Sequence, residues 1–180
     1  MLEKKIIMSY AFSFIQYLKY FFKASNGRGH GVHSPFVYSF IISVLNKKNQ
    51  YSNTENVNKY DALVQSMISY YTPESICIED ALNKEQALTK ISNLERVDLL
   101  YLKKIKNSDD LWMFFNTVMQ KVNSQSILIF EGIHQNSQMQ ACWENIKMNQ
   151  QVRLTIDVFK LGILFFRTEQ REKENFIIRF

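Results

Sequence analysis

Three histidines are the side chains of this sequence best suited to acid–base or anion-binding chemistry, and two of them share a glycine-rich turn. His30 and His33 follow Arg28 in the segment 28–33, which reads RGHGVH. A basic turn before a helix N-terminus can bind an anion, because free backbone N–H groups and the helix dipole both favour negative charge. No strand precedes this turn, so the pattern favours the alternative in which His33 bonds the backbone and helps to cap the next helix.

The third histidine, His134, follows an apolar run that we expect to form a strand of a parallel sheet. Ligands of open α/β sheets bind at the carboxyl ends of such strands, and Glu131 closely precedes His134. The two side chains could form an acid–base pair, although a histidine at this place more often hydrogen-bonds loop carbonyls. The candidate interaction or residual-site residues are therefore Arg28, His30, His33, Glu131 and His134.

No catalytic triad or metal-binding pattern can be assembled from the other side chains. Ser-His-Asp and Cys-His arrangements are missing from the sequence, and its Cys and His residues lack metal-ligand spacing. Cys77 lies in an apolar run and Cys142 in a helical pattern, so we expect two buried thiols rather than a disulfide. We predict a reducing, cytoplasmic location, no catalytic residue and no metal.

The elements that would position these residues form three groups. Apolar side chains at helical spacing predict helices first, at residues 5–23, 35–45 and 57–71. Short apolar runs then alternate with amphipathic segments, which is typical of parallel strands joined by crossover helices. We expect the strands at residues 75–79, 97–102 and 126–130, and the helices at 84–92, 109–122 and 137–148.

The end of the chain differs, because three strand-like runs follow one another without a helix between them. These runs cover residues 152–159, 162–167 and 175–180. They predict an antiparallel C-terminal edge on a parallel core. We therefore expect an α/β protein, with an N-terminal helical region at residues 1–72 and an α/β domain at residues 73–180 in one compact unit.

Composition is that of a globular domain with charge concentrated at its N-terminus. The chain has 180 residues, of which 46% are hydrophobic and 14% aromatic, enough for a core without metals or disulfides. Residues 1–50 hold seven basic and one acidic residue, whereas the other 130 residues hold 15 basic and 16 acidic. This asymmetry can attract acidic lipid, nucleic acid or an acidic protein surface, or it can be an ordinary solvated surface.

The apolar N-terminal stretch, residues 6–22, is not expected to be a signal peptide or to cross a membrane. Ser9, Ser13, Gln16 and Lys19 interrupt it, and it is shorter than the ~20 apolar residues that span a bilayer. No small-residue cleavage site follows it. Its polar side chains form a narrow stripe, so most of this helix is expected to seek burial.

Five segments carry motifs that are specific in combination. They are residues 31–38 (GVHSPFVY), 127–134 (ILIFEGIH), 141–147 (ACWENIK), 155–167 (TIDVFKLGILFFR) and 176–180 (FIIRF). Together they resemble a class I S-adenosylmethionine-dependent methyltransferase-like family of Bacteroidetes, over residues 10–45 and 95–180. The resemblance implies a Rossmann-like methyltransferase sheet and, in the family, S-adenosylmethionine as cofactor.

The sequence departs from that family in the half that would hold the cofactor. Relatives place a glycine loop after the first strand, where bare Cα positions let the backbone approach the ligand, but residues 78–85 read IEDALNKE. Only about 18 residues separate this strand from Val97, so two strand–helix units of the family are expected to be missing. The family's acidic motifs correspond here to residues 103–106 (KKIK) and 131–132 (EG). We predict a reduced sheet with a lost S-adenosylmethionine site and no cofactor.

The favoured hypothesis is a non-catalytic methyltransferase-like scaffold, a pseudoenzyme that docks through its aromatic, basic N-terminal helix. Its expected partner is a protein or complex, which could hold it at the inner face of the membrane, and self-association remains open. The alternative is an active S-adenosylmethionine-dependent methyltransferase with an atypical cofactor site. A nucleic-acid binder ranks third and is not expected.

Overall fold

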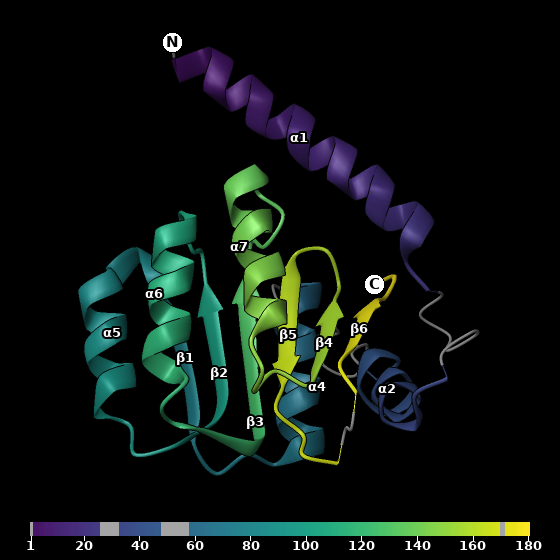
Figure 1. Cartoon of the computed structure of the whole chain (residues 1–180), viewed down its shortest axis with the longest axis vertical. Helices are drawn as coiled ribbons and strands as arrows, with labels where there is room; N and C mark the ends of the chain where they lie inside the picture. Colours follow the sequence, from purple (N-terminus) through teal and green to yellow (C-terminus); the bar gives the residue numbers. More distant parts are fainter. Residues whose placement is uncertain (1, 26–32, 48–57, 170–171) are drawn as a thin grey trace.

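The computed structural model describes residues 2–25, 33–47, 58–169 and 172–180 and has the expected α/β architecture (Figure 1). Within these residues a six-stranded sheet has the order β1-β2-β3-β5-β4-β6. The strands are β1 (Ile76–Asp80), β2 (Val97–Lys103), β3 (Val122–Glu131), β4 (Leu154–Asp157), β5 (Leu161–Phe165) and β6 (Glu174–Ile177). The helices are α1 (Leu2–Lys23), α2 (Pro35–Phe40), the π-helical turn η1 (Ile41–Leu45), α4 (Lys59–Tyr71), the 3-10 turn η2 (Ala81–Asn83), α5 (Lys84–Asn93), α6 (Ser108–Val118) and α7 (Ser137–Met148).

The C-terminal edge of the sheet is antiparallel in one strand only. Strands β1, β2 and β3 pair in parallel, as expected, and β5 runs antiparallel to both β3 and β4. The last strand, β6, pairs in parallel with β4, which corrects the expectation of a wholly antiparallel edge. The reason is that β6 runs opposite to β5, as β4 does, but pairs with β4 on its outer side instead of with β5, so its neighbour runs in the same direction.

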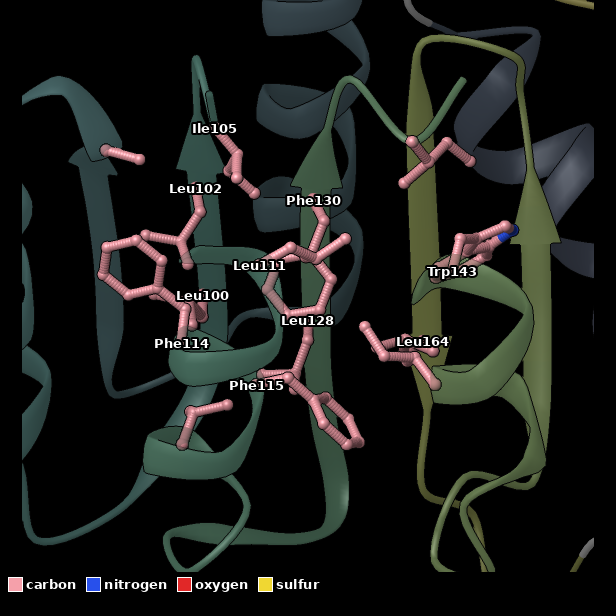
Figure 2. Close-up of a cluster of buried hydrophobic side chains, with 14 of the residues drawn as sticks. Leu100, Leu102, Ile105, Leu111, Phe114, Phe115, Leu128, Phe130, Trp143 and Leu164 are labelled. Carbon is pink, nitrogen blue, oxygen red and sulfur yellow. The ribbon is translucent and has the colours of Figure 1, made fainter. Parts of the chain in front are cut away.

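Helices cover both faces of the sheet, so its central strands contain runs of buried apolar residues, such as residues 127–130 of β3 and the whole of β5. Figure 1 shows α5, α6 and α7 on one face, with α2 and α4 on the other. Alternate residues of a strand serve the two faces: Leu100 and Leu102 pack with α6, while Leu99 and Tyr101 belong to the cluster that includes α4. In Figure 2, Phe114 of α6 approaches the Leu100 and Leu102 side chains.

Two of the helix boundaries that differ from the sequence-based expectation have an identifiable cause. Helix α4 begins at Lys59 rather than at residue 57, because the Asn58 side chain accepts hydrogen bonds from the backbone N–H groups of residues 60 and 61. Helix α6 ends at Val118 rather than at residue 122, since Val122 pairs with Val97 and opens β3. Ser34 and Pro35 stand at the expected N-cap and first helical positions of α2, but the Ser34 side chain makes no capping bond.

Both cysteines are free and buried, which confirms the expected thiols. Burial, together with the charge of Glu79, raises the pKa of Cys77 to about 11. Burial and the charge of Asp109 likewise raise the pKa of Cys142. Both groups are therefore protonated at neutral pH and act as small packing groups rather than as nucleophiles.

The crossover from β3 to β4 passes over β5, and this close approach depends on Gly162. Trp143 of α7 is fully buried, and its ring lies against the Gly162 backbone of β5. A Cβ at position 162 would lie 2.7 Å from the ring atom Cη2 and 2.8 Å from Cζ3, both on a rigid indole. The bare Cα therefore creates the room in which α7 packs on the sheet.

Gly162→Ala should lower the free energy of unfolding by about 1–3 kcal/mol, because the added methyl group overpacks this contact. Denaturant unfolding measures the change, with Met148→Ala as a control at an exposed position of α7. Combining Gly162→Ala with Trp143→Phe should recover part of the loss. Equal stability of Gly162→Ala and the unsubstituted protein would contradict this account of the packing.

Candidate functional site

The candidate residues that the structure describes lie in two separate places. Glu131 and His134 follow β3 at the end of the sheet that faces α1, the end to which the β2 and β3 arrows point (Figure 1). His33 precedes α2 and is exposed; its ring makes no hydrogen bond within the part of the chain that the structure describes. Arg28 and His30 lie outside the described residues. The structure therefore brings together Glu131 and His134 in one region, but not His33.

The possible acid–base pairing of Glu131 with His134 does not occur, and the favoured alternative, a His134 that hydrogen-bonds loop carbonyls, is not seen in the described chain either. The Glu131 carboxylate accepts a hydrogen bond from the Lys104 backbone N–H at 3.0 Å, and its other oxygen lies 3.5 Å from Lys160 Nζ. Gly132, with a φ of +89°, turns the chain directly after Glu131. This turn sends the two side chains to different neighbours, because only glycine adopts such a φ without strain.

His134 pairs instead with Asp157 at the end of β4, a residue that the sequence analysis missed. His134 Nε2 lies 2.6 Å from Asp157 Oδ2, and both side chains are about nine-tenths buried. The second oxygen, Asp157 Oδ1, accepts a hydrogen bond of 2.7 Å from the backbone N–H of Phe159. The only sign in the sequence was an acidic residue at the end of a mostly apolar strand. Such a residue does not indicate which side chain it pairs with.

The His134–Asp157 pair holds an aromatic platform in place. Phe159 has a left-handed φ of 66°, which is unfavourable for a bulky residue, and the bond to Asp157 compensates for it. The Phe159 ring stacks on His134, with ring centroids 5.5 Å apart. The Phe159 ring also contacts two rings of α1. Tyr17 packs edge-on with a centroid distance of 5.1 Å, and the Tyr20 centroid lies 5.3 Å away.

Tyr20 fastens α1 to the C-terminal segment. Its hydroxyl donates to the Ile178 carbonyl and accepts from the Phe180 backbone N–H at 3.1 Å. Burial raises the pKa of Tyr20, so the phenol stays protonated and keeps donating. Just beyond the helix, the Ser25 N–H donates to the Ile177 carbonyl at 2.8 Å. The C-terminal end of α1 is therefore anchored by hydrogen bonds as well as by ring contacts.

A small cavity of about 180 Å³ remains between α1 and the His134–Asp157 pair. Its wall on the α1 side is polar, with Gln16, Lys19, Tyr20 and Lys23. Pockets for small molecules measure about 300–1,000 Å³, so this cavity suits water or a small ion better than a nucleoside. His134 Nδ1 is buried beside it without a hydrogen-bond partner in the described chain.

The end of β1 has a different chemistry. Asp80 Oδ1 accepts a hydrogen bond from the Leu82 backbone N–H at 2.9 Å and so opens the turn η2. Asp80 Oδ2 lies 2.6 Å from Lys104 Nζ. The hydrogen bond from Lys104, then the one from Leu82, lower the pKa of Asp80. The carboxylate is thus occupied by its own chain at the place where the family resemblance implies a cofactor loop.

Comparisons with known proteins yield no relative. No family model matches the chain, and neither curated proteins nor solved structures return a significant match. Among the residues that the structure describes, no helix is long and apolar enough to cross a membrane. In the same residues, no cluster of His, Cys, Asp and Glu side chains is arranged to hold a metal ion.

The most unusual surface of the molecule is the outer side of α1. Its exposed apolar residues are Phe14, Ile15, Leu18, Phe21 and Phe22. Phe22 is 82% exposed and Phe14 63% exposed, values more typical of lysine than of phenylalanine. Their spacing of three, four and seven residues puts them on one side of the helix, opposite Tyr20. We call these five residues the α1 apolar face.

Asp157→Ala should lower the free energy of unfolding by about 1–3 kcal/mol, because the buried His134 ring and the Phe159 N–H both lose their acceptor. The variant should also expose α1 to proteolysis, since the platform under Tyr17 and Tyr20 is released. Unfolding midpoints and limited proteolysis measure the two effects. The control is Glu144→Ala, at a half-exposed position of the same cavity. Equal unfolding midpoints and equal proteolysis rates of the two variants would contradict the role of Asp157.

Proposed function

We propose that this protein is a non-catalytic, methyltransferase-like scaffold that binds a partner protein through the α1 apolar face. The observation that carries the proposal is the orientation of α1. Its polar side points toward its own domain, where Gln16, Lys19, Tyr20 and Lys23 line a cavity. Its apolar side points outward, the reverse of what a helix in a stable monomer does.

The exposed face has the form of a helix that fits a groove. Phe14, Leu18 and Phe21 follow the spacing i, i+4 and i+7, with Ile15 and Phe22 widening the stripe. Helices that bind apolar grooves present anchors at this spacing, and large aromatic side chains supply most of the binding free energy at protein interfaces. Lys19 and Lys23 are exposed beside the stripe, which suits a partner with an acidic rim.

The anchoring of α1 supports a docking role, because the helix is held chiefly by residues outside this face. Tyr20, Ser25 and Phe159 fix its C-terminal end. The Arg179 guanidinium adds a hydrogen bond of 2.8 Å to the Phe21 carbonyl and lies over the Phe21 ring. A helix that is already fixed loses less conformational freedom on binding than a free one.

The shape of the sheet supports the methyltransferase-like and non-catalytic parts of the proposal. An antiparallel β5 beside a parallel core agrees with the sheet ending that the family resemblance implies. Open α/β sheets bind nucleotides where the strand order reverses, but β1 is an edge strand and the order β1-β2-β3 does not reverse. The Asp80–Lys104 ion pair occupies the end of that strand.

Replacing the apolar face with small polar side chains should remove partner binding and leave the fold intact. The variant is Phe14→Ser, Leu18→Ser and Phe22→Ser in the full chain. The tagged protein purified from its native cells should lose a stoichiometric partner, because each buried anchor contributes about 1.5–3 kcal/mol. A matched control substitutes three exposed apolar residues elsewhere, Tyr38→Ser, Ile42→Ser and Met148→Ser, and should keep the partner.

The other possible occupants of the face give different outcomes in the same experiment. Self-association that disappears in the α1 variant, measured by sedimentation, would identify a second copy as the partner. Binding to anionic vesicles that disappears in the α1 variant would identify a lipid surface. Identical recovery of partners by both variants would exclude docking through α1.

Calorimetry with S-adenosylhomocysteine separates the scaffold from the alternative, an active methyltransferase. We expect no binding heat at millimolar ligand, because the cavity under α1 is small and Asp80 is engaged by Lys104. A dissociation constant in the micromolar range would establish a nucleoside site and overturn the non-catalytic assignment.

A further inference from the structure

A second concave region lies at the opposite end of the sheet, away from α1. It consists of two adjoining cavities of about 460 Å³ and about 320 Å³. Both are lined by Tyr71, Ser124, Gln125 and Ile127, so they form one groove. Each volume falls in the range of small-molecule pockets, about 300–1,000 Å³. None of its lining residues belongs to the site under α1, and the inference below does not depend on the proposed function.

Aromatic rings form one wall of this groove. Phe36 packs edge-on against Phe165 at 5.0 Å, and Tyr71 lies 6.1 Å from the same Phe165 ring. The Arg167 guanidinium stacks over Phe36 at 4.2 Å. The wall therefore offers apolar ring faces next to a planar cation, a combination that suits a ligand with a flat apolar body and a negative end.

Two buried hydrogen-bond donors in this wall have no acceptor. Tyr71 Oη and Arg167 Nε make no hydrogen bond within the described chain, although both atoms are buried. Burial raises the pKa of Tyr71, so its phenol remains protonated. Glu169 forms a loose ion pair with Arg167, 3.6 Å from Nη2, and its side chain is 71% exposed; this contact leaves Arg167 Nε without an acceptor in the described chain. Buried donors without partners are rare and call for an acceptor from elsewhere.

The other charges of the groove are already compensated. Arg96 forms an ion pair with Glu74 and lies 3.6 Å from Asp98 Oδ2. The same Asp98 oxygen accepts hydrogen bonds from the backbone N–H groups of Glu74 and Ser75 at 3.0 and 2.9 Å. The acceptor-poor part of the groove is therefore the end that carries Tyr71 and Arg167. The Arg167 side chain is 34% exposed, so it can turn to admit a ligand.

We propose that this groove binds a small organic acid. The carboxylate accepts hydrogen bonds from Tyr71 Oη and Arg167 Nε, and the apolar body lies against the half-buried rings of Phe36 and Tyr71. A carboxylate supplies the two acceptor oxygens that the donors lack, and hydrogen bonds of this charged kind are the stronger ones in proteins. A neutral amide or a carboxylate without an apolar body satisfies only half of the site.

Calorimetry and NMR titration with benzoate test the proposal on the full chain. Benzoate should bind with a millimolar dissociation constant and shift the resonances of Tyr71 and Phe36. Benzamide, which lacks the charge, and acetate, which lacks the ring, should each bind about tenfold more weakly or not at all. Tyr71→Phe and Arg167→Gln should each weaken benzoate binding about tenfold, because each removes one donor to the carboxylate.

Tyr70→Phe is the matched control, since Tyr70 is the neighbouring tyrosine and is exposed; it should bind benzoate like the unsubstituted protein. Unfolding midpoints of all variants verify that they are folded. No benzoate binding would mean that water satisfies the two donors, and equal binding of benzoate and benzamide would mean that the groove is only apolar. Either result overturns the proposal.

Discussion

The hydrogen bond between His134 and Asp157 is the interaction on which the arrangement of the N-terminal helix depends. It joins the turn after β3 to the end of β4, two strands that are separated in the sheet by β5. Because Asp157 also binds the Phe159 N–H, the pair stabilises a left-handed residue whose ring contacts α1. A histidine and an aspartate at the carboxyl ends of strands resemble a catalytic pair, and here both contact Phe159, which packs on α1.

The order of the strands has consequences for where a ligand can bind. Crossover connections between parallel strands are right-handed, and the chain moves in one direction from β1 through β2 and β3 to β4. Helices α5, α6 and α7 therefore all cover the same face (Figure 1). The opposite face is covered by α2, η1 and α4 from the N-terminal region. The parallel strands β1, β2 and β3 of the described chain therefore lack the reversal of strand order at which open α/β sheets bind ligands.

The two sides of helix α1 have different surroundings. The polar stripe and Tyr20 serve the domain, while the aromatic and aliphatic side chains remain outside. An apolar stripe of this kind is unfavourable in water, and monomeric proteins rarely expose one that is contiguous. The side chains that attach α1 to the domain are thus largely distinct from those of the α1 apolar face, with Phe21, which Arg179 contacts, in both sets.

Much of the fold could be predicted because local patterns report which positions are buried. Alternating apolar runs and amphipathic segments located the strands and helices, and Pro35 marked the start of α2. Helix and strand boundaries were missed where they depend on a residue distant in the sequence. Val122, for example, belongs to β3 and not to α6 because it pairs with Val97. The sequence also leaves open which aromatic residues of a helix are buried: Phe114 and Phe115 of α6 are buried, whereas Trp112 of the same helix is 43% exposed.

The candidate site was predicted only in part. His134 and Glu131 follow a strand that the sequence reveals, but the partner of His134 lies 23 residues further along the chain. Only the packing of β3 and β4 on either side of β5 makes Asp157 that partner. The sequence by itself determined the elements, the buried thiols and the two-sided character of α1. The tertiary structure alone decided which side of α1 faces the domain, because periodicity separates two sides of a helix without saying what each will meet.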